Sequence, residues 1–219
     1  MSKNLIDAKI FVIALLTALA AAADSTIAIA KDTHYQHFSL KENISVEVPS
    51  HWLVHTDSEK KNFAAAAEAA ARTAGIDYDN NKDKSRLLAI SALPTPSGAK
   101  VRINLIRPLP FSSAELRSVS AQELKEFKAE MTESFQSAVA AMGVKLLDVA
   151  TPSIEMINGS PALLLEYRRS DLSGPSPWTI KQYMIPTGDK MIELTISCRE
   201  SDASIWKPIL EYVKQSLRF

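Results

Sequence analysis

Four histidines, all within the first 55 residues, are the side chains best suited to metal binding or to proton transfer. His34 and His37 are three residues apart, and His51 and His55 are four residues apart. Imidazoles at these spacings converge on one ion only where the backbone is helical or suitably turned. We expect solvated histidines and no metal centre, and His51 and His55 are the candidate ligands if a metal is bound.

Local motifs of the common enzyme classes are absent from the sequence. It contains no GxSxG, HExxH, CxxC or GxGxxG motif and no Walker loop. Nucleophilic, zinc and nucleotide chemistry therefore have no local signature. A catalytic triad assembled from distant segments stays open, and one of the four histidines would have to supply its base. We predict no catalytic residue, no cofactor-binding residue and no cofactor.

The stretch at 77–85 has the composition of a calcium loop but not its spacing. With Asp77 as position 1, position 6 is Lys82 and position 12 is Leu88. An EF-hand needs a glycine at position 6 for its sharp turn and a bidentate glutamate at position 12. We therefore expect a polar surface loop.

Two arginines and a tryptophan form the candidate recognition site. Arg168 and Arg169 lie beside Asp171 near the end of one predicted strand, and Trp178 follows a proline-rich loop. We predict that Arg168, Arg169 and Trp178 bind a protein partner. The competing interpretation of Trp178 is a core residue at the start of a strand.

The charge balance excludes several classes of protein. The 219 residues include 25 Lys and Arg and 25 Asp and Glu, which gives a formal net charge of zero. Such a chain lacks the one-signed field of a nucleic-acid binder or of a polybasic membrane-surface protein. Its 46% hydrophobic content is that of a globular domain. The single cysteine, Cys198, excludes an internal disulfide and is predicted to lie in the core.

The first thirty residues have the pattern of a secretory signal peptide. Lys3 and Lys9 lie before an uncharged run at 10–23. This run is shorter than the roughly 20 apolar residues of a membrane span, and it fits a signal core of about 7–15 residues. Small residues favour cleavage before Asp24, with an alternative site before Lys31. The competing interpretation is an uncleaved anchor or a buried helix.

We divide the chain into a signal peptide at 1–23, a flexible tail at 24–37 and a single α+β domain at 38–219. The mature protein is predicted to be periplasmic or secreted, without a membrane span. Its oligomeric state cannot be predicted from these patterns.

Apolar residues recur at every second position in some segments of the domain and at every third or fourth position in others. They predict a hairpin at 38–48, a helix at 63–74, strands at 87–93 and 100–107, a long helix at 124–142, strands at 144–149, 153–157, 162–168, 178–185 and 191–198, and a closing helix from 204. Strands joined by tight turns are antiparallel, so the helices must cover the sheet in layers. The fold class is α+β, an antiparallel β-sheet covered by helices in an αβα sandwich.

Several segments resemble the PsbP-like family, which has the fold of a photosystem II extrinsic protein and includes bacterial envelope relatives. They are residues 38–52, the hairpin at 157–162, the strand at 183–186 with its turn at Gly188, and the end of the chain at 213–219. The resemblance covers most of 38–219 as an order of elements and rests on turn and core residues. It implies a small, mostly non-enzymatic accessory or assembly protein, or an envelope protein or chaperone. The chaperone branch acts in the cytosol, which the predicted signal peptide argues against.

We expect a non-enzymatic accessory or assembly module that binds a protein partner at the cell envelope. Two alternatives stay open. A hydrolase with a dispersed triad would place His51 or His55 within hydrogen-bond reach of a serine and a carboxylate in a concave pocket. A small-ligand carrier would show a closed apolar cavity between the long helix and the sheet.

Overall fold

The computed structural model describes residues 33–219, except for residues 57, 60–83, 95–96 and 173. The predicted signal peptide at 1–23 and the predicted helix at 63–74 lie outside the described residues, as does most of the calcium-like stretch at 77–85. No helix in the described ranges is long and apolar enough to cross a membrane.

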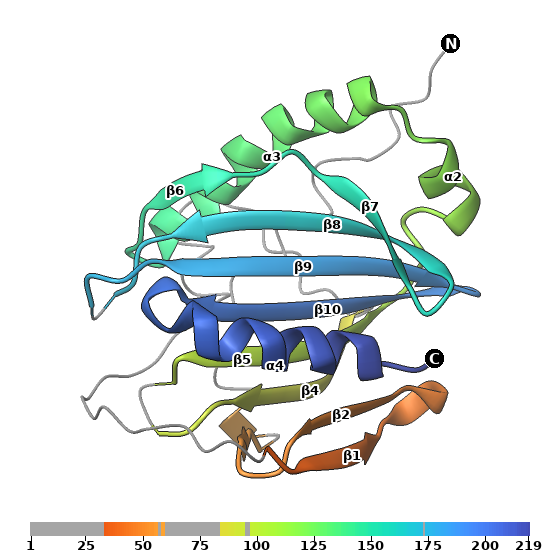
Figure 1. Ribbon diagram of the computed structural model, residues 1–219. Helices are drawn as coiled ribbons and strands as arrows, with labels where there is room; N and C mark the ends of the chain where they lie inside the picture. The colour runs from red at the N-terminus through yellow and green to blue at the C-terminus, as the bar shows by residue number, and fades with distance from the viewer. Residues whose placement is uncertain (1–32, 57, 60–83, 95–96, 173) are drawn as a thin grey trace.

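An antiparallel sheet of eight strands forms the centre of the fold (Figure 1). The strands follow the order β3-β4-β5-β10-β9-β8-β6, and β7 also pairs with β8. Since β6 and β7 pair with different ends of β8, they form one edge of the sheet together. The strands are β3 (Leu53–Val54), β4 (Lys84–Ser91), β5 (Ala99–Ile106), β6 (Leu146–Val149), β7 (Ser153–Ile157), β8 (Ser160–Arg169), β9 (Trp178–Thr187) and β10 (Lys190–Arg199).

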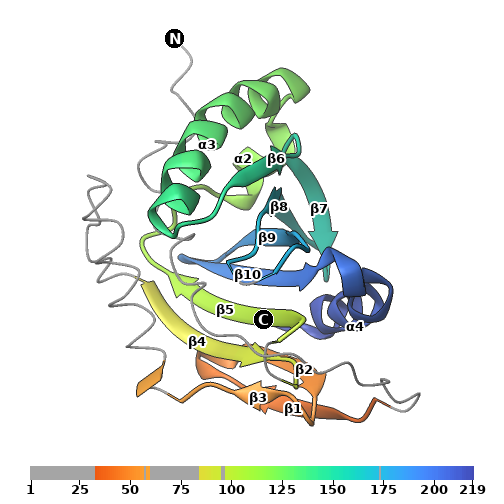
Figure 2. The ribbon, with the colours of Figure 1, turned by 90° about the vertical axis from the view of Figure 1, so that its left-hand side faces the viewer.

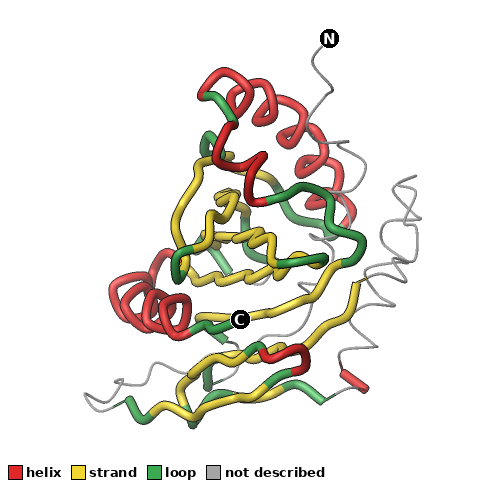
Figure 3. The backbone as a smooth tube through the Cα atoms, turned by 90° about the vertical axis from the view of Figure 1, so that its right-hand side faces the viewer, coloured by secondary structure: helices red, strands yellow, loops and turns green. Residues whose placement is uncertain are grey.

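Helices cover both faces of this sheet. Figure 2 shows α2 (Ser113–Ser118) and α3 (Ala121–Ala141) on one side and α4 (Ala203–Ser216) on the other. A hairpin of β1 (Tyr35–Ser39) and β2 (Ser45–Pro49) forms a separate two-stranded sheet in contact with α4. Figure 3 shows the strands lying between the helices from the opposite direction. The predicted α+β sandwich is therefore confirmed.

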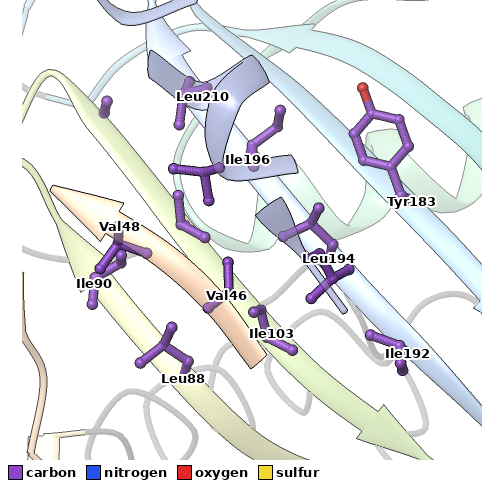
Figure 4. Close-up of a cluster of buried hydrophobic side chains, with 14 of the residues drawn as sticks. Val46, Val48, Leu88, Ile90, Ile103, Tyr183, Ile192, Leu194, Ile196 and Leu210 are labelled. Carbon is purple, nitrogen blue, oxygen red and sulfur yellow. The ribbon is translucent and has the colours of Figure 1, made fainter. Parts of the chain in front are cut away.

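Two hydrophobic cores lie on the two faces of the sheet. The first lies between the sheet, α4 and β2, and Figure 4 shows Val46 and Val48 beside Leu88 and Ile90. Cys198 belongs to this core at 3% exposure, as predicted, and burial raises the pKa of its thiol. The second core lies beneath α3, whose apolar stripe was predicted from its spacing. The buried residues of α3 are Phe127, Met131, Phe135, Ala138 and Val139.

The first strand begins earlier in the chain than the sequence predicted. The flexible tail was placed at 24–37, whereas β1 begins at Tyr35 and pairs with β2 as far as Pro49. Residues 35–37 show little apolar alternation, so periodicity could not reveal them. Backbone pairing holds them in the strand, and the Tyr35 ring packs on Tyr212 of α4 with 4.1 Å between the ring centres.

Turn residues and capping boxes that can be read from the sequence mark several boundaries of the helices and strands. Asn158 and Gly159 have φ values of 48° and 83° between β7 and β8, as a type I′ hairpin turn requires. The capping boxes at 56–59 and 120–123 are both formed. A third box at 112–115 begins α2, which was not predicted. This helix has six residues and buries only Leu116, so it has no apolar stripe to detect.

Candidate functional site

The α3 face of the sheet carries a polar stripe that is mostly buried. Side chains alternate along a strand, so Glu193 points to the same face as Met191, which packs in the core beneath α3. Neighbouring strands place polar side chains in adjoining rows. The buried polar residues of the described chain all lie on this face: Ser91, Asn104, Arg169, Gln182, Glu193, Thr195 and Ser197.

Glu193 lies at the centre of this stripe, and its side chain is fully buried. The Lys84 ammonium lies 3.0 Å from each oxygen of the Glu193 carboxylate. Asn104 donates an amide hydrogen bond to one oxygen, and Gln182 donates another to the second oxygen at 2.9 Å. The donors belong to β4, β5 and β9, so one carboxylate on β10 joins four consecutive strands. We name these four residues the Glu193 network.

Hydrogen bonds offset the burial of charge in the Glu193 network. Removing an ion pair from water costs several kcal/mol per ion, and close, fully bonded geometry must compensate for it. Burial lowers the pKa of Lys84, and the Glu193 carboxylate opposes that effect. Arg86 Nε donates to Asn104 Oδ1 at 3.2 Å, which leaves the Asn104 amide hydrogens for Glu193. The network is therefore suited to a structural role across the sheet.

A second polar group surrounds Trp178 at one end of the stripe. The cationic groups of Lys100, Arg169 and Arg199 lie 5.3, 5.8 and 5.7 Å from the centre of the Trp178 ring. Asp171 accepts a hydrogen bond from Arg199 Nε at 3.1 Å. We name these five residues the Trp178 cluster. They come from the ends of β8, β9 and β10 that meet at one side of the sheet, from the start of β5, and from the loop after β8.

Cations outnumber carboxylates by three to one in the Trp178 cluster. Burial and the neighbouring cations Arg102 and Arg169 together lower the pKa of Lys100 to about 8. Burial also lowers the pKa of Arg169. Like charges repel more strongly in a protein interior than in water. Burial and repulsion therefore disfavour the charged forms of Lys100 and Arg169 in the folded protein.

The indole of Trp178 has an unusual environment for a buried donor. Trp178 is 3% exposed, and its Nε1 hydrogen has no acceptor among the described residues. Trp52 and Trp206 also have buried Nε1 atoms without an acceptor. Their rings, however, meet edge to face at 5.7 Å, where a ring face is a weak acceptor. Trp178 is surrounded by cations, which cannot accept a hydrogen bond.

The three predicted partner-binding residues do not share one surface. Arg169 and Trp178 belong to the Trp178 cluster. Arg168 is on the opposite face, where its Nη2 donates to Glu200 Oε2 at 2.8 Å and Thr179 donates to the same carboxylate. Successive side chains of a strand point to opposite faces, so the predicted recognition edge is divided between the two faces of the sheet.

The candidate metal ligands do not lie on one helical face. His51 is exposed in the turn after β2, and His55 follows the short strand β3. Their four-residue spacing therefore lacks the backbone that would bring the imidazoles together. Within the described part of the chain, no three His, Cys, Asp or Glu side chains are grouped closely enough to hold a metal ion.

His55 contacts a serine. Its Nε2 lies 2.8 Å from Ser91 Oγ, and its Nδ1 lies 4.0 Å from Glu59 Oε1. The order of groups is that of a nucleophile, a base and an acid. A separation of 4.0 Å is too long for a hydrogen bond, and Glu59 Oε2 already accepts from the Thr56 amide and hydroxyl. His55 and Ser91 thus meet the serine condition of the hydrolase alternative, whereas Glu59 does not meet its carboxylate condition.

Sequence reasoning did not single out Lys100, Arg199 or the Glu193 network. Glu193, Thr195 and Ser197 alternate in the sequence with the apolar residues Ile192, Leu194 and Ile196, which indicates a polar face on this strand. In a sandwich with helices on both faces, such a polar face is covered as well. The combination of polar alternation with a predicted three-layer fold is the signal that could have found these residues.

Comparisons with known proteins identify the fold. The sequence matches no family model and no curated protein. Its structure is similar to the solution structure of cyanobacterial PsbP (CyanoP) from Synechocystis, with a TM-score of 0.51 and 11% identity over 89% of this chain and 97% of that chain. LpqN, involved in cell envelope biogenesis of Mycobacterium tuberculosis, has a TM-score of 0.41 and 12% identity over 85% of this chain and 92% of that chain. The similarity to CyanoP confirms the resemblance found in the sequence at the level of the fold.

We predict that the Glu193 network stabilises the sheet. Glu193→Ala leaves the Lys84 ammonium buried without its carboxylate, so the free energy of unfolding should fall by about 3–5 kcal/mol. Replacing both charges, in Glu193→Leu with Lys84→Met, should recover roughly half of that loss. Urea denaturation measures both values. Glu166→Ala breaks the surface pair with Lys181 and should cost under about 1 kcal/mol; equal losses for Glu166→Ala and Glu193→Ala would contradict the prediction.

We also predict a pH-dependent effect at Lys100. Its pKa is about 8 in the folded protein and ordinarily 10.5, so the unfolded chain binds more protons between these values and stability should rise with pH across this window. Lys100→Met removes the disfavoured charge and should stabilise the fold by on the order of 1 kcal/mol at pH 7, with the difference vanishing near pH 10.5. Urea denaturation at several pH values tests this, with the exposed Lys125→Met as control. A destabilised Lys100→Met variant at pH 7 would refute it.

Proposed function

We propose that this PsbP-like chain is a non-enzymatic accessory or assembly module that binds a protein partner at the cell envelope. Its fold is the one for which such roles were expected from the sequence resemblance. The charged and apolar pattern of residues 1–23 supports delivery to the periplasm or to the exterior, with cleavage before Asp24.

The observation that carries this proposal is the Trp178 cluster. Tryptophan and arginine are enriched among the residues that dominate the energy of protein interfaces. Three cations are retained around one buried indole although their repulsion opposes folding. Groups that lower stability are characteristic of functional sites, where activity and stability compete. An ammonium and two guanidinium groups can recognise negative charge on a partner.

The contact between His55 and Ser91 favours a hydrolase as the second candidate. A base at 2.8 Å from a hydroxyl is the first requirement of an activated serine. The Glu59 oxygen lies 4.0 Å from Nδ1, too far for Glu59 to act as the hydrogen-bonded carboxylate of a triad. Ser91 is also only 8% exposed, which restricts the approach of a substrate. These two features rank the hydrolase below the binding module.

The described side chains give the small-ligand carrier no support. The long helix α3 packs directly on the sheet, and the ring centres of Phe135 and Tyr167 lie 4.7 Å apart across this interface. Met131 and Val139 are buried in the same layer. Apolar side chains thus occupy the part of the interlayer space that a ligand would fill.

Site-specific crosslinking tests the binding proposal. Leu172 is 50% exposed and follows Asp171 of the Trp178 cluster, whereas Met156 is 61% exposed on the edge strand β7. With a photo-crosslinking amino acid at position 172, we expect one defined product in the envelope fraction. The same group at position 156 should give none, and combining the 172 crosslinker with Arg169→Met should abolish the product. No product at 172 under several growth conditions, or identical products at both positions, would contradict the proposal.

The hydrolase candidate has its own test. An activated Ser91 should react with a fluorophosphonate probe, and Ser91→Ala and His55→Asn should abolish that reaction. The binding-module proposal predicts that the wild type reacts no more than Ser91→Ala. Labelling that maps to Ser91 by peptide mass spectrometry would reverse the ranking of the two functions.

A further inference from the structure

We propose that the Trp178 cluster binds carboxylate groups on an acidic segment of the protein partner. This inference rests on the proposed function and names the chemistry of the partner. It follows from the charge balance, the bonding and the exposure of the cluster.

The charges of the Trp178 cluster are incompletely neutralised within the described structure. Arg199 has a carboxylate partner in Asp171 at 3.1 Å. Arg169 donates to the neighbouring backbone oxygen of Ser170 at 2.9 Å and otherwise faces the indole. The Lys100 ammonium has the Trp178 ring as its contact, without a hydrogen bond or ion pair to any described side chain. Three cations and one carboxylate leave two positive charges.

The donors of the cluster suit a carboxylate. Guanidinium groups bind carboxylates through two parallel hydrogen bonds, and an ammonium adds a third donor. The Trp178 ring is buried beneath the three cations and positions them, and its Nε1 hydrogen has no acceptor among the described residues. Asp171 accepts one hydrogen bond from Arg199 Nε at 3.1 Å, so the site has one carboxylate of its own and donors left for others.

Exposure indicates a protein segment as the source of the carboxylate. The Arg199 side chain is 20% exposed and Lys100 is half-buried, whereas Arg169 and Trp178 are buried, so a partner would reach the cluster at Arg199 and Lys100. Leu172, directly beside it, presents a half-exposed apolar side chain. An extended segment with acidic residues and an apolar neighbour would contact both features. A free inorganic anion would use only the charges.

Charge elsewhere in the chain supports the same conclusion. The formal net charge is zero, so the protein has no broad positive field to attract a nucleic acid or an anionic membrane. The Trp178 cluster places three cations and one carboxylate together at one end of the sheet. A localised site of this kind recognises a localised group of acidic side chains.

Binding should depend on pH through Lys100. The charged groups that influence its ammonium are Arg102 on the same strand, Arg169 and Arg199 at the ends of β8 and β10, and Asp171 in the adjoining loop. Three of these four are cations, and with burial they bring the pKa of Lys100 to about 8. A bound carboxylate stabilises the protonated form, so affinity should fall as pH rises above 8.

Fluorescence anisotropy with a labelled peptide tests the proposal on the intact protein. The probe is a fluorescein-labelled peptide of alternating Glu and Leu residues, and its counterpart with Gln in place of Glu is the neutral control. We expect the Glu peptide to bind at least tenfold more tightly than the Gln peptide. Lys100→Met and Arg169→Met should each weaken Glu-peptide binding tenfold or more, and raising the pH from 7 to 9 should weaken wild-type binding.

Arg168→Met is the matched control, because Arg168 is the adjoining residue on the opposite face of β8. It should leave peptide affinity unchanged within twofold. Thermal unfolding measures whether each variant is folded. Lys100→Gln takes the place of Lys100→Met if that variant is not folded. Equal loss in Arg168→Met and Arg169→Met would overturn the inference, as would competition by millimolar inorganic phosphate as effective as competition by the unlabelled peptide. A third outcome is a partner that crosslinks at position 172 while the protein binds the Glu and Gln peptides with equal affinity. That result would overturn the acidic specificity alone and leave the binding function intact.

Discussion

The buried carboxylate of Glu193 is the interaction on which the rest of the sheet depends. It accepts hydrogen bonds from β4, β5 and β9 while it belongs to β10, so four consecutive strands meet at one charged group. A one-residue shift in any of these strands would turn a donor to the opposite face. Because an unpaired buried charge is far less stable than a paired one, the carboxylate selects one register for the centre of the sheet.

A fixed register has a consequence at the end of the same stripe. Arg169, Trp178 and Arg199 lie in one row across β8, β9 and β10. Lys100 lies on the same face of β5 as Arg102, two residues before it. Mutual repulsion would separate these cations if their strands could slide. The satisfied network and the apolar layers on both faces hold them in place, so the charged cluster persists although burial and repulsion disfavour its charges.

Much of the fold could be predicted because apolar alternation, turn residues and capping boxes each have a local cause. The type I′ turn at Asn158 and Gly159 and the apolar stripe of α3 are examples. The site was harder to predict. Arg169 and Trp178 were singled out from adjacent loop residues, but Lys100 lies 69 positions before Arg169, and only the pairing of β5 with β10 brings it near. Arg168 was included because sequence proximity does not reveal which face a residue occupies.

The indole resonances of the protein test the central claim most directly. The chain has three tryptophans, and Trp52 and Trp206 lie in the core on the opposite face from Trp178. In a nitrogen-15 NMR titration with the Glu-containing peptide, the Nε1–H signal of Trp178 should move because the cations around its ring gain a carboxylate, while the signals of Trp52 and Trp206 stay fixed. A Trp178 signal that does not move at saturating peptide, or three signals that move together, would contradict the assignment of the Trp178 cluster as the recognition site.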